Sequence, residues 1–424
     1  MPQIKPFRAY LYNSMKVDLG DVVAPPYDVI SPSQQADLYA NSPHNCVRLI
    51  LNRDVEKYIS AAQFYEEWKK KKILLRDARP AIYVLSQRYK TPDGKSHERK
   101  GFIAACRLEE IGKGSILPHE RTLSKPKADR LELFKSTGAM FSQIFGIYAD
   151  PNGVIDAVMK GVMHSIAVAE FTFEHVENKL WVLRDQSLIQ SVTEYIKRQK
   201  ILVADGHHRY ETALLYRDFM RSQSPKYTGE EPFNFVPMYL TNMHAPGLAI
   251  LPTHRLIHSL SKFDQAQMME NLGKRFQVIA GLTKEKMLEE LHFRKTGAFG
   301  VVLTEPPNFS IICRDPPKEG TEISTVKFVD TLDVSILHRE IIGNILGITE
   351  EQQLQKTNLD YEKDAEAAIE AVKVGTAQAA FLMNPTMVED VRKAAEAGDV
   401  MPQKSTYFYP KLVSGLVNYS FTEE

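Results

Sequence analysis

The stretch "ILVADGHHRYETALLYRDF", residues 201–219, joins an apolar segment to a helix through an acid, a glycine, two histidines and an arginine. Residues 201–204 are too few for a stable helix and are typical of a buried strand. From Tyr210 onward, apolar residues recur at the spacing of one helix face. Gly206 therefore falls at a strand-to-helix turn, where the lack of a Cβ atom permits a sharp turn or the close approach of a ligand.

The polar residues of this turn have the chemistry of a phosphate-binding site. The first amides of a helix point outward, and the helix dipole adds about half a positive charge there. Gly206, His208 and Arg209 are therefore expected to bind phosphate, with Arg209 as a forked cationic donor. Asp205 could hold a metal ion that accompanies the phosphate, or it could orient a histidine. Asp205 and His207 are the expected catalytic residues at this turn.

Two plainer interpretations of the same residues stay open. Asp205 could be an ordinary N-cap, with His207 and His208 as surface residues of the first helical turn. A zinc site could combine these histidines with His119 or His254, although neighbouring side chains on a helix point about 100° apart and rarely ligate one ion. A cap alone does not require the sequence Gly-His-His-Arg, so we favour the phosphate site.

Length, composition and charge restrict the class of protein. The chain has 424 residues, which predicts two or three domains. Hydrophobic residues make up 43% and charged residues 25%, the mix of a soluble globular protein. The 53 basic residues balance the 53 acidic ones, so the chain has no general attraction to nucleic acid or to an anionic membrane.

Several kinds of segment and motif are missing from the sequence. No apolar run approaches the roughly 20 residues that span a bilayer, and the first residues lack the apolar core of a signal peptide. The spacing of Cys46, Cys106 and Cys313 predicts neither a disulfide framework nor a Cys-rich zinc site. We expect a cytoplasmic protein. The absence of GxxxxGKS/T, GxGxxG, HExxH and GxSxG motifs argues against P-loop, Rossmann, zinc-protease and α/β-hydrolase enzymes.

Helical and strand-like patterns alternate along the chain, which predicts a mixed α/β (α+β) fold. Residues 61–74 have the pattern of an amphipathic helix, and residues 80–111 have that of two strands joined by a turn. We expect three regions. These are an N-terminal mixed α/β region over residues 1–155, a phosphate-binding region packed with it over residues 156–262, and a C-terminal α/β domain over residues 263–424.

The sequence resembles known proteins at two levels, one local and one over the whole chain. "VADGHHRYETAL", residues 203–214, resembles the phosphate-binding signature of the ParB/sulfiredoxin-like superfamily, in the form found in its free serine kinases, which move phosphate from ADP to serine. The whole chain resembles domain-of-unknown-function family 1015 in the stretches "VVAPPYDVI", "NCVRLIL", "LPHERTL", "ADGHHRYETA" and "MPQKSTYFYPKLVSGLV". The first resemblance implies a ParB/sulfiredoxin-like nucleotide-site region with additional mixed α/β domains. It also implies ADP or ATP as the nucleotide, together with Mg²⁺.

The segment around Glu120 is the expected second half of the site. In the serine kinases a glutamate near the end of an early strand is the proposed base, and Glu120 is the candidate for that role here. It precedes Asp205 by about 85 residues, a longer interval than in those kinases, and a surface ion pair between Glu120 and Arg121 is the alternative. His119 and Arg121 are expected to contact substrate.

Further polar residues are expected to bind substrate or phosphate. Lys127 and Arg130 share a helix face at i,i+3 spacing, with a solvated face as the alternative. In "APPYDVISP", Tyr27 and Asp28 lie in a stiff turn before a helix that Ser31 should cap, with a purely structural turn as the equal alternative. Asn45 and Arg48 are candidates for binding a substrate carboxylate, with a loop N-cap as the alternative for this segment. Lys404, Ser405 and Thr406 are candidates for binding phosphate, with a blunted edge strand as the alternative.

The function these features favour is a small-molecule phosphotransferase of ParB/sulfiredoxin type. By resemblance it would act on serine or phosphoserine with a nucleotide, either as a kinase or in the reverse, dephosphorylating direction. A nucleotide-dependent, ParB-like binding switch that contacts DNA or protein is one alternative, although the balanced charge argues against nucleic acid. A hydrolase of another phosphorylated metabolite is the second alternative. The expected partner is a small-molecule substrate, and a homodimer is left open.

Overall fold

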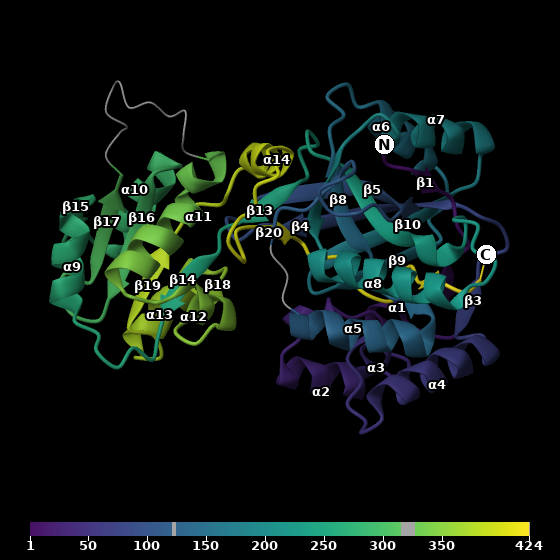
Figure 1. Cartoon of the computed structure of the whole chain (residues 1–424), viewed down its shortest axis with the longest axis horizontal. Helices are drawn as coiled ribbons and strands as arrows, with labels where there is room; N and C mark the ends of the chain where they lie inside the picture. Colours follow the sequence, from purple (N-terminus) through teal and green to yellow (C-terminus); the bar gives the residue numbers. More distant parts are fainter. Residues whose placement is uncertain (121–123, 315–326, 424) are drawn as a thin grey trace. The chain divides into compact units, whose positions relative to one another are not determined.

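The computed structural model describes residues 1–120, 124–314 and 327–423, and the chain forms two compact units (Figure 1). Unit 1 consists of Met1–Pro118, Thr122–Ala249 and Pro410–Glu424. Unit 2 consists of His119–Arg121 and Ile250–Tyr409. Each unit combines helices with a sheet, so the mixed α/β fold predicted from the sequence is confirmed.

Unit 1 is built around a nine-stranded sheet. Eight strands follow the order β6-β11-β8-β12-β5-β4-β10-β9, and β1 pairs with β5 beside this path. The pairs β6–β11 and β8–β12 are parallel, and the remaining pairs are antiparallel. The strands are β1 Ile4–Lys5, β4 Ile82–Lys90, β5 Ser96–Arg107, β6 Ile116–Leu117, β8 Ile144–Tyr148, β9 Ala169–Phe173, β10 Val176–Leu183, β11 Ile201–Asp205 and β12 Phe235–Asn242.

The pairing of β10 with β4 joins segments that the sequence predicted to lie in different regions. β4 and β5 form the hairpin expected over residues 80–111, and its turn is closed by a 2.8 Å hydrogen bond from the Gly94 amide to the Thr91 carbonyl. β10 then adds to β4 from beyond residue 155, with Leu180 opposite Leu85. The sheet of unit 1 therefore contains strands from both sides of the expected boundary.

Helices cover both faces of this sheet. In Figure 1, α6 and α7 lie on one side of it, and α8, α5 and α4 follow in layers on the other side. The amphipathic pattern of residues 61–74 corresponds to α4, which buries Ala61, Tyr65 and Trp68. The helices are α1 Leu19–Val22, α2 Pro32–Asn41, α3 Val47–Ile50, α4 Lys57–Lys70, α5 Ser124–Thr137, α6 Val154–Val162, α7 Gln186–Ile196 and α8 His207–Gln223, with 3₁₀ helices Tyr27–Val29 and Pro232–Asn234.

Residues 410–423 return to unit 1 and are fixed there by buried polar contacts. The Gln143 amide donates to the Val417 carbonyl at 2.6 Å, and the hydroxyls of Ser142 and Ser414 lie 2.6 Å apart. Two short strand pairs complete the unit: β2 Tyr10–Tyr12 with β3 Leu74–Arg76, and β7 Ala139–Met140 with β21 Tyr419–Ser420.

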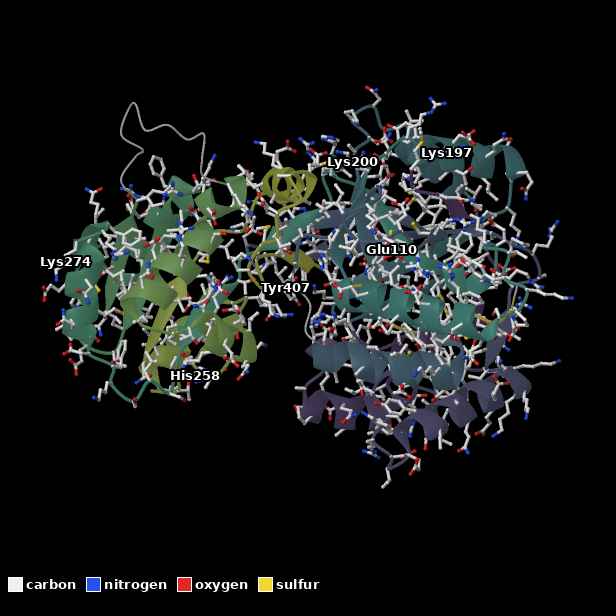
Figure 2. The ribbon with its side chains drawn as sticks, in the orientation of Figure 1. Glu110, Lys197, Lys200, His258, Lys274 and Tyr407 are labelled. Carbon is white, nitrogen blue, oxygen red and sulfur yellow. The ribbon has the colours of Figure 1, made fainter. Side chains whose placement is uncertain are left out.

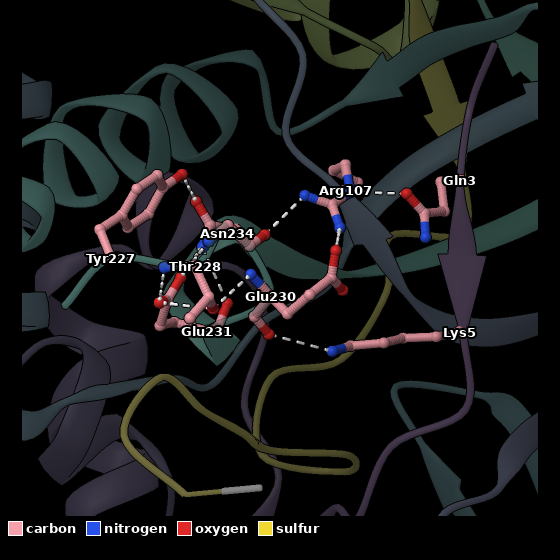
Figure 3. Close-up of polar contacts among 9 residues, drawn as sticks. Gln3, Lys5, Arg107, Tyr227, Thr228, Glu230, Glu231 and Asn234 are labelled. Atoms are coloured by element: carbon pink, nitrogen blue, oxygen red, sulfur yellow. Dashed lines mark hydrogen bonds and ion pairs between the residues drawn. The ribbon is translucent and has the colours of Figure 1, made fainter.

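A polar network orders the loop that precedes β12 (Figure 3). Arg107 on β5 donates to the Gln3 side chain at 2.6 Å and also pairs with Glu230. The Glu231 carboxylate accepts from the Gly229 amide at 2.9 Å and from the Asn234 side chain at 3.0 Å. Lys5 of β1 also donates to the Glu230 carbonyl at 3.4 Å, so side-chain contacts hold the loop to β1 and β5.

Unit 2 contains a six-stranded antiparallel sheet in the order β15-β17-β16-β19-β14-β18. Its core includes Met287 and Leu291 of α10, Val372 of α13 and Leu382 of β19. The elements are β13 Ala249–Leu251, β14 His254–Ile257, β15 Gln277–Ala280, β16 Ala298–Leu303, β17 Phe309–Cys313, β18 Leu359–Glu362, β19 Ala379–Leu382, β20 Tyr407–Tyr409, α9 Gln265–Gly273, α10 Lys284–Arg294, 3₁₀ helix Phe328–Thr331, α11 Asp333–Ile336, π-helix Leu337–Ile345, α12 Glu350–Gln355, α13 Ala365–Lys373 and α14 Val388–Glu396.

The surface of each unit carries charged side chains. Lys197, which follows α7, and Lys274, which follows α9, both point outward (Figure 2). Within the described part of the chain, no helix has the length and apolar character needed to cross a membrane. Cys46, Cys106 and Cys313 are buried and free, so they form no disulfide.

Candidate functional site

The turn between β11 and α8 has the geometry that the sequence predicted. β11 ends at Asp205, and α8 begins at His207. Gly206 lies between them in the left-handed region, with φ 92° and ψ 26°, and no side chain caps the helix. A Cβ atom at this position would lie 3.0 Å from Nη2 of Arg209. The alternative in which Asp205 is an ordinary N-cap is therefore wrong, because Gly206 holds that position.

Two cations bind the carboxylate of Asp205. Nη2 of Arg209 lies 2.7 Å from Oδ2, and Nζ of Lys411 pairs with Oδ1. The guanidinium of Arg209, whose residue is 6% exposed, also donates through Nη1 to the Gln143 carbonyl. Arg209 is consequently held in one orientation, across the turn that Gly206 makes.

A third cation, Arg99 of β5, acts on the same carboxylate through its electric field. The residue is fully buried, and its Nη2 donates to the Gln87 side chain and, at 2.6 Å, to the Pro410 carbonyl. Burial lowers the pKa of Arg99, while the negative charge of Asp205 opposes this shift. Arg99, Arg209 and Lys411 thus bring positive charge toward Asp205, and a second anion beside it would be stabilised by the same groups.

His207 is neutral in this environment. Burial is the main cause that lowers the pKa of His207 to about 4; the charges of His208, Lys411 and Arg209 act in the same direction, and Asp205 opposes them. A neutral imidazole can accept a proton, and the negative charge of a bound phosphate would raise its pKa toward neutrality. His208 is half-buried, and its main-chain carbonyl accepts from the Thr212 hydroxyl at 2.7 Å.

The residues at this turn do not form a metal site in the state that the structure shows. Among the described residues, no group of three or more His, Cys, Asp or Glu side chains is placed to hold a metal ion. Both oxygens of Asp205 are engaged by Arg209 and Lys411, so a metal ligand at this position would first have to break an ion pair. The described residues of this turn therefore do not fit Mg²⁺ in this arrangement.

Tyr27 and Arg130 lie close to this turn. The guanidinium carbon of Arg130 stands 4.2 Å from the centre of the Tyr27 ring. Burial raises the pKa of Tyr27, and the charges of Arg130 and Arg209 oppose that shift, so its hydroxyl lies in the field of both arginines. Arg130 is 5% exposed and donates to the Ile50 carbonyl at 2.6 Å. Asp28, in the same 3₁₀ turn as Tyr27, is exposed.

The remaining predicted residues of unit 1 have contacts of their own. Nζ of Lys127 lies 2.6 Å from Oε2 of Glu211, which ties α5 to α8 by a partly buried ion pair. The Asn45 side chain, fully buried, donates to the carbonyls of Asp21 and Val23 and accepts from the Val47 amide. These contacts fix the loop before α3, Val47–Ile50, but they do not cap it, since Cys46 holds the N-cap position and no side chain caps this helix. Arg48 donates to the Tyr39 carbonyl at 2.9 Å and lies over the Tyr39 ring.

Two predicted segments far apart in sequence meet in unit 2. Nε2 of His119 lies 3.1 Å from the Thr406 hydroxyl, and Glu120 accepts from the Lys404 amide at 3.3 Å. Ser405 donates to the Pro402 carbonyl at 2.6 Å. Arg121 lies outside the described residues. Because this cluster belongs to unit 2 and Asp205 to unit 1, the catalytic role of Glu120 stays a prediction.

Sequence reasoning gave no role to three groups at the turn: Arg99, Gln143 and Lys411. Arg99 had a usable signal, because it shares a strand face with Gly101, Ile103 and Ala105, where a charged residue is unexpected. Gln143 contributes a main-chain carbonyl, which residue type does not reveal. Lys411 pairs with Asp205 across 206 residues of sequence, and no local pattern predicts such a contact.

Comparisons with known proteins give one family match and several distant structural similarities. A family model described as "Protein of unknown function (DUF1015)" matches residues 4–335. No curated protein matches the sequence at a significant level. The chain is similar to a free serine kinase in complex with AMP, at 13% identity over 73% of this chain and 93% of that one, with a TM-score of 0.37. It is also similar to a conserved hypothetical protein from Pyrococcus furiosus (13% identity, 73% and 97%, TM-score 0.35) and to SbnI with C-terminal truncation from Staphylococcus aureus (9% identity, 74% and 86%, TM-score 0.36).

Proposed function

This chain belongs to the DUF1015 family of proteins of unknown function, and we propose that it binds the phosphates of a nucleotide at the start of α8. It then transfers a phosphoryl group between that nucleotide and a small hydroxyl-bearing molecule. The observation that carries the proposal is the convergence of Arg209 and Lys411 on Asp205 at a strand-to-helix turn whose glycine has positive φ.

The phosphate would be bound by main-chain amides and by cations together. The first amides of a helix have no acceptor within the helix, and they point along its axis toward an approaching anion. The absence of a Cβ atom at Gly206 lets a phosphate oxygen come close to the main chain. Arg209 is already oriented by Gln143, so little side-chain entropy is lost when it binds.

Phosphoryl transfer requires positioning and charge neutralisation more than covalent chemistry from the protein. The cations around Asp205 would neutralise charge on the transferred group. His207, neutral and buried at the same turn, is the nearby group that could accept the hydroxyl proton once a bound phosphate has raised its pKa. Glu120 is a second candidate for this role, on the ground of its resemblance to the base of the free serine kinases.

The proposed small molecule is serine, or phosphoserine in the reverse direction. Support comes from the Asp-Gly-His-His-Arg sequence of residues 205–209, which resembles the motif of the free serine kinases. Tyr27, whose hydroxyl lies in the field of Arg209, and Arg130, which stands over the Tyr27 ring, are the proposed contacts for the carboxylate of this substrate. Asp28, Lys127 and Arg48 are further candidates from the sequence.

Nucleotide binding can be tested with a matched pair of lysine variants. Lys411→Gln removes a cation from the site, and we expect the affinity for ADP to fall about tenfold, as for the loss of one hydrogen bond to a charged group. Lys69 is the control, because its side chain is 18% exposed against 17% for Lys411 and it pairs with Glu66 and Glu423 rather than with Asp205. Isothermal titration calorimetry should show unchanged affinity in Lys69→Gln. Equal affinity of wild type and Lys411→Gln would contradict the proposed site.

Transfer is a separate claim and requires a separate measurement. Phosphorus NMR of the wild-type protein with ADP and serine, and with ADP and phosphoserine, should show the appearance or loss of a phosphoserine signal. Glu120→Gln should slow this reaction while leaving ADP affinity unchanged, if Glu120 takes the proton. Binding of ADP without transfer to or from serine would leave the phosphate site standing and remove the proposed substrate.

A further inference from the structure

Unit 2 contains a cavity of about 440 Å³ that plays no part in the proposed function. Its walls come from the π-helix Leu337–Ile345, from α12, from Tyr361 of β18 and from residues 400–403. Cavities of about 300–1,000 Å³ commonly hold small ligands. A π-helix is rare and occurs frequently at functional sites. The combination makes this cavity a candidate ligand site.

Two buried polar side chains in the wall lack the partners that buried polar groups normally have. Ser335 is 7% exposed, and its hydroxyl has no hydrogen-bond partner among the described residues. Gln403 is 9% exposed, and its side-chain amide makes no hydrogen bond to another described residue, but its polar atoms are not fully enclosed, so it can reach a ligand or solvent in the cavity. An enclosed polar group without a partner is destabilising, so the Ser335 hydroxyl in the cavity wall indicates that a polar ligand satisfies it.

A buried cation lies behind the same wall. Arg255 is 1% exposed, and Nε donates to Nε2 of His338 at 3.2 Å. Its remaining hydrogen bonds go to the carbonyls of Thr253 and Lys404 and to the sulfur of Met383. These acceptors are uncharged, so within the described residues the Arg255 charge has no carboxylate partner. A buried charge of this kind is stabilised by an anion nearby.

His338 lies between Arg255 and the cavity and is hydrogen-bonded to Arg255. Because Nε2 accepts from Arg255, Nδ1 carries the proton and donates to Oε1 of Gln353 at 2.8 Å. Both His338 and Gln353 line the cavity. The carboxylate of Asp330, also in the wall, pairs with Arg339 at 3.3 Å, and Arg339 pairs with Glu340 at 2.9 Å as well. Glu350 is exposed to solvent. The part of the wall next to His338, where the buried charge of Arg255 lies, therefore favours an anion.

We propose that this cavity binds a small metabolite through a carboxylate group. The carboxylate accepts from the Ser335 hydroxyl and the Gln403 amide, in the field of Arg255, and the apolar part of the ligand packs on the wall. The apolar wall residues include Ile348, Leu354 and Met401. A hydroxyl, an amide and a shielded guanidinium suit a single negative charge better than a phosphate, which requires several cationic donors.

The experiment uses calorimetry of the full chain with acetate, butyrate and benzoate, and with the matching primary amides as neutral probes. We expect at least one carboxylate to bind and its amide to bind more weakly. Ser335→Ala and Gln403→Leu should each reduce the carboxylate affinity at least about tenfold, the effect of losing a hydrogen bond to a charged group. Each variant should be as stable as wild type or more stable, because the group removed has no partner in the unliganded protein.

Ser310→Ala is the matched control, because the Ser310 hydroxyl is also buried without a partner among the described residues but lies outside the cavity. It should leave carboxylate affinity unchanged. Failure of all three carboxylates to bind, equal affinity for the amides, or unchanged affinity in both wall variants would each overturn the proposal. Clear destabilisation in Ser335→Ala and Gln403→Leu without a change in affinity would show that both residues are merely structural.

Discussion

Gly206 illustrates how a single residue sets the chemistry of the turn. Its left-handed conformation directs the main chain from β11 into α8, and a Cβ atom at this position would lie 3.0 Å from Nη2 of Arg209. The residue type alone predicted that the main chain turns at Gly206, since glycine adopts positive φ without strain. Asn45 shows the opposite case. Its chemistry suits substrate binding, but its amide is used for main-chain hydrogen bonds that only the folded chain reveals.

Replacing Gly206 with Ala should affect both stability and nucleotide binding. The left-handed conformation costs a non-glycine residue about 1–2 kcal/mol, and the added methyl group would push Arg209 from its position. Gly153 is the matched control, because it is the N-cap of α6 with φ 63° and a Cβ atom there would only reach Asp156 at 3.8 Å. Denaturant unfolding should show a loss in both variants, larger in Gly206→Ala because Arg209 is displaced there, whereas calorimetry should show weaker ADP binding in Gly206→Ala alone. Normal ADP affinity in Gly206→Ala would contradict this placement of the phosphate.

At the scale of elements, Arg209 joins three segments of unit 1. It extends from α8 to Asp205 at the end of β11 and to the carbonyl of Gln143, just before β8. The apolar stripe of α8 begins after Arg209, so the sequence predicted that the helix would dock without it. The structure corrects this expectation, because Arg209 is buried and its contacts hold the start of the helix to the sheet.

Arg209→Ala should therefore destabilise the protein as well as weaken nucleotide binding. Removing one partner of a mostly buried ion pair commonly costs about 3–5 kcal/mol, and the 22% exposure of the Asp205 side chain brings our expectation to about 2–3 kcal/mol. Urea unfolding measures this directly. A midpoint equal to that of wild type would show that Arg209 contributes to binding alone.

Local elements could be predicted from the sequence because their signals are local. The β4–β5 hairpin, the helix α4 and the β11–α8 junction follow from periodicity and turn residues, and the Ser31 cap of α2 is confirmed by its hydrogen bond from the Gln34 amide. The two-residue strands β1, β6, β7 and β21 could not be predicted, because segments so short have no periodicity. Their pairing depends on packing that no local pattern encodes.

At the scale of the whole molecule, the chain's path determines which polar residues meet. Residues 410–423 cross back into unit 1, which brings Lys411 to Asp205, whereas residues 400–406 stay in unit 2 with His119 and Glu120. The sequence predicted the chemistry of these segments but not their partners. Contacts across two hundred residues are set by the tertiary fold, and a single sequence contains no signal for them.

The buried histidines predict how stability depends on pH. Burial is the main cause that lowers the pKa of His207 and of His254 to about 4 and that of His338 to about 3, from an ordinary value of 6.5. The charge of Arg255 contributes to the lowered pKa of both His254 and His338. Asp364 opposes the shift at His254, and the hydrogen bond to Gln353 opposes it at His338. Below pH 6.5 these histidines bind protons in the unfolded chain but stay neutral in the folded chain. Stability is therefore complete above pH 6.5 and falls as the pH drops toward about 4.

The expected loss at pH 5 is about 2 kcal/mol for each of these histidines, since one pKa unit corresponds to about 1.4 kcal/mol. Urea unfolding across this pH range measures it. The free energy of unfolding should change less with pH in His338→Gln, because glutamine has no group that takes up a proton at that position. A free energy of unfolding that stays constant between pH 6.5 and pH 5 would show that these histidines are not held neutral in the folded protein.

The most direct test of the central claim is a crystal structure of the full chain with ADP bound. We predict that a phosphate of ADP lies at the first turn of α8, accepting from its main-chain amides, with Arg209 and Lys411 within hydrogen-bond distance of the phosphate oxygens. A structure with ADP bound elsewhere, and with the turn at Gly206 still occupied only by the Asp205 ion pairs, would contradict the account.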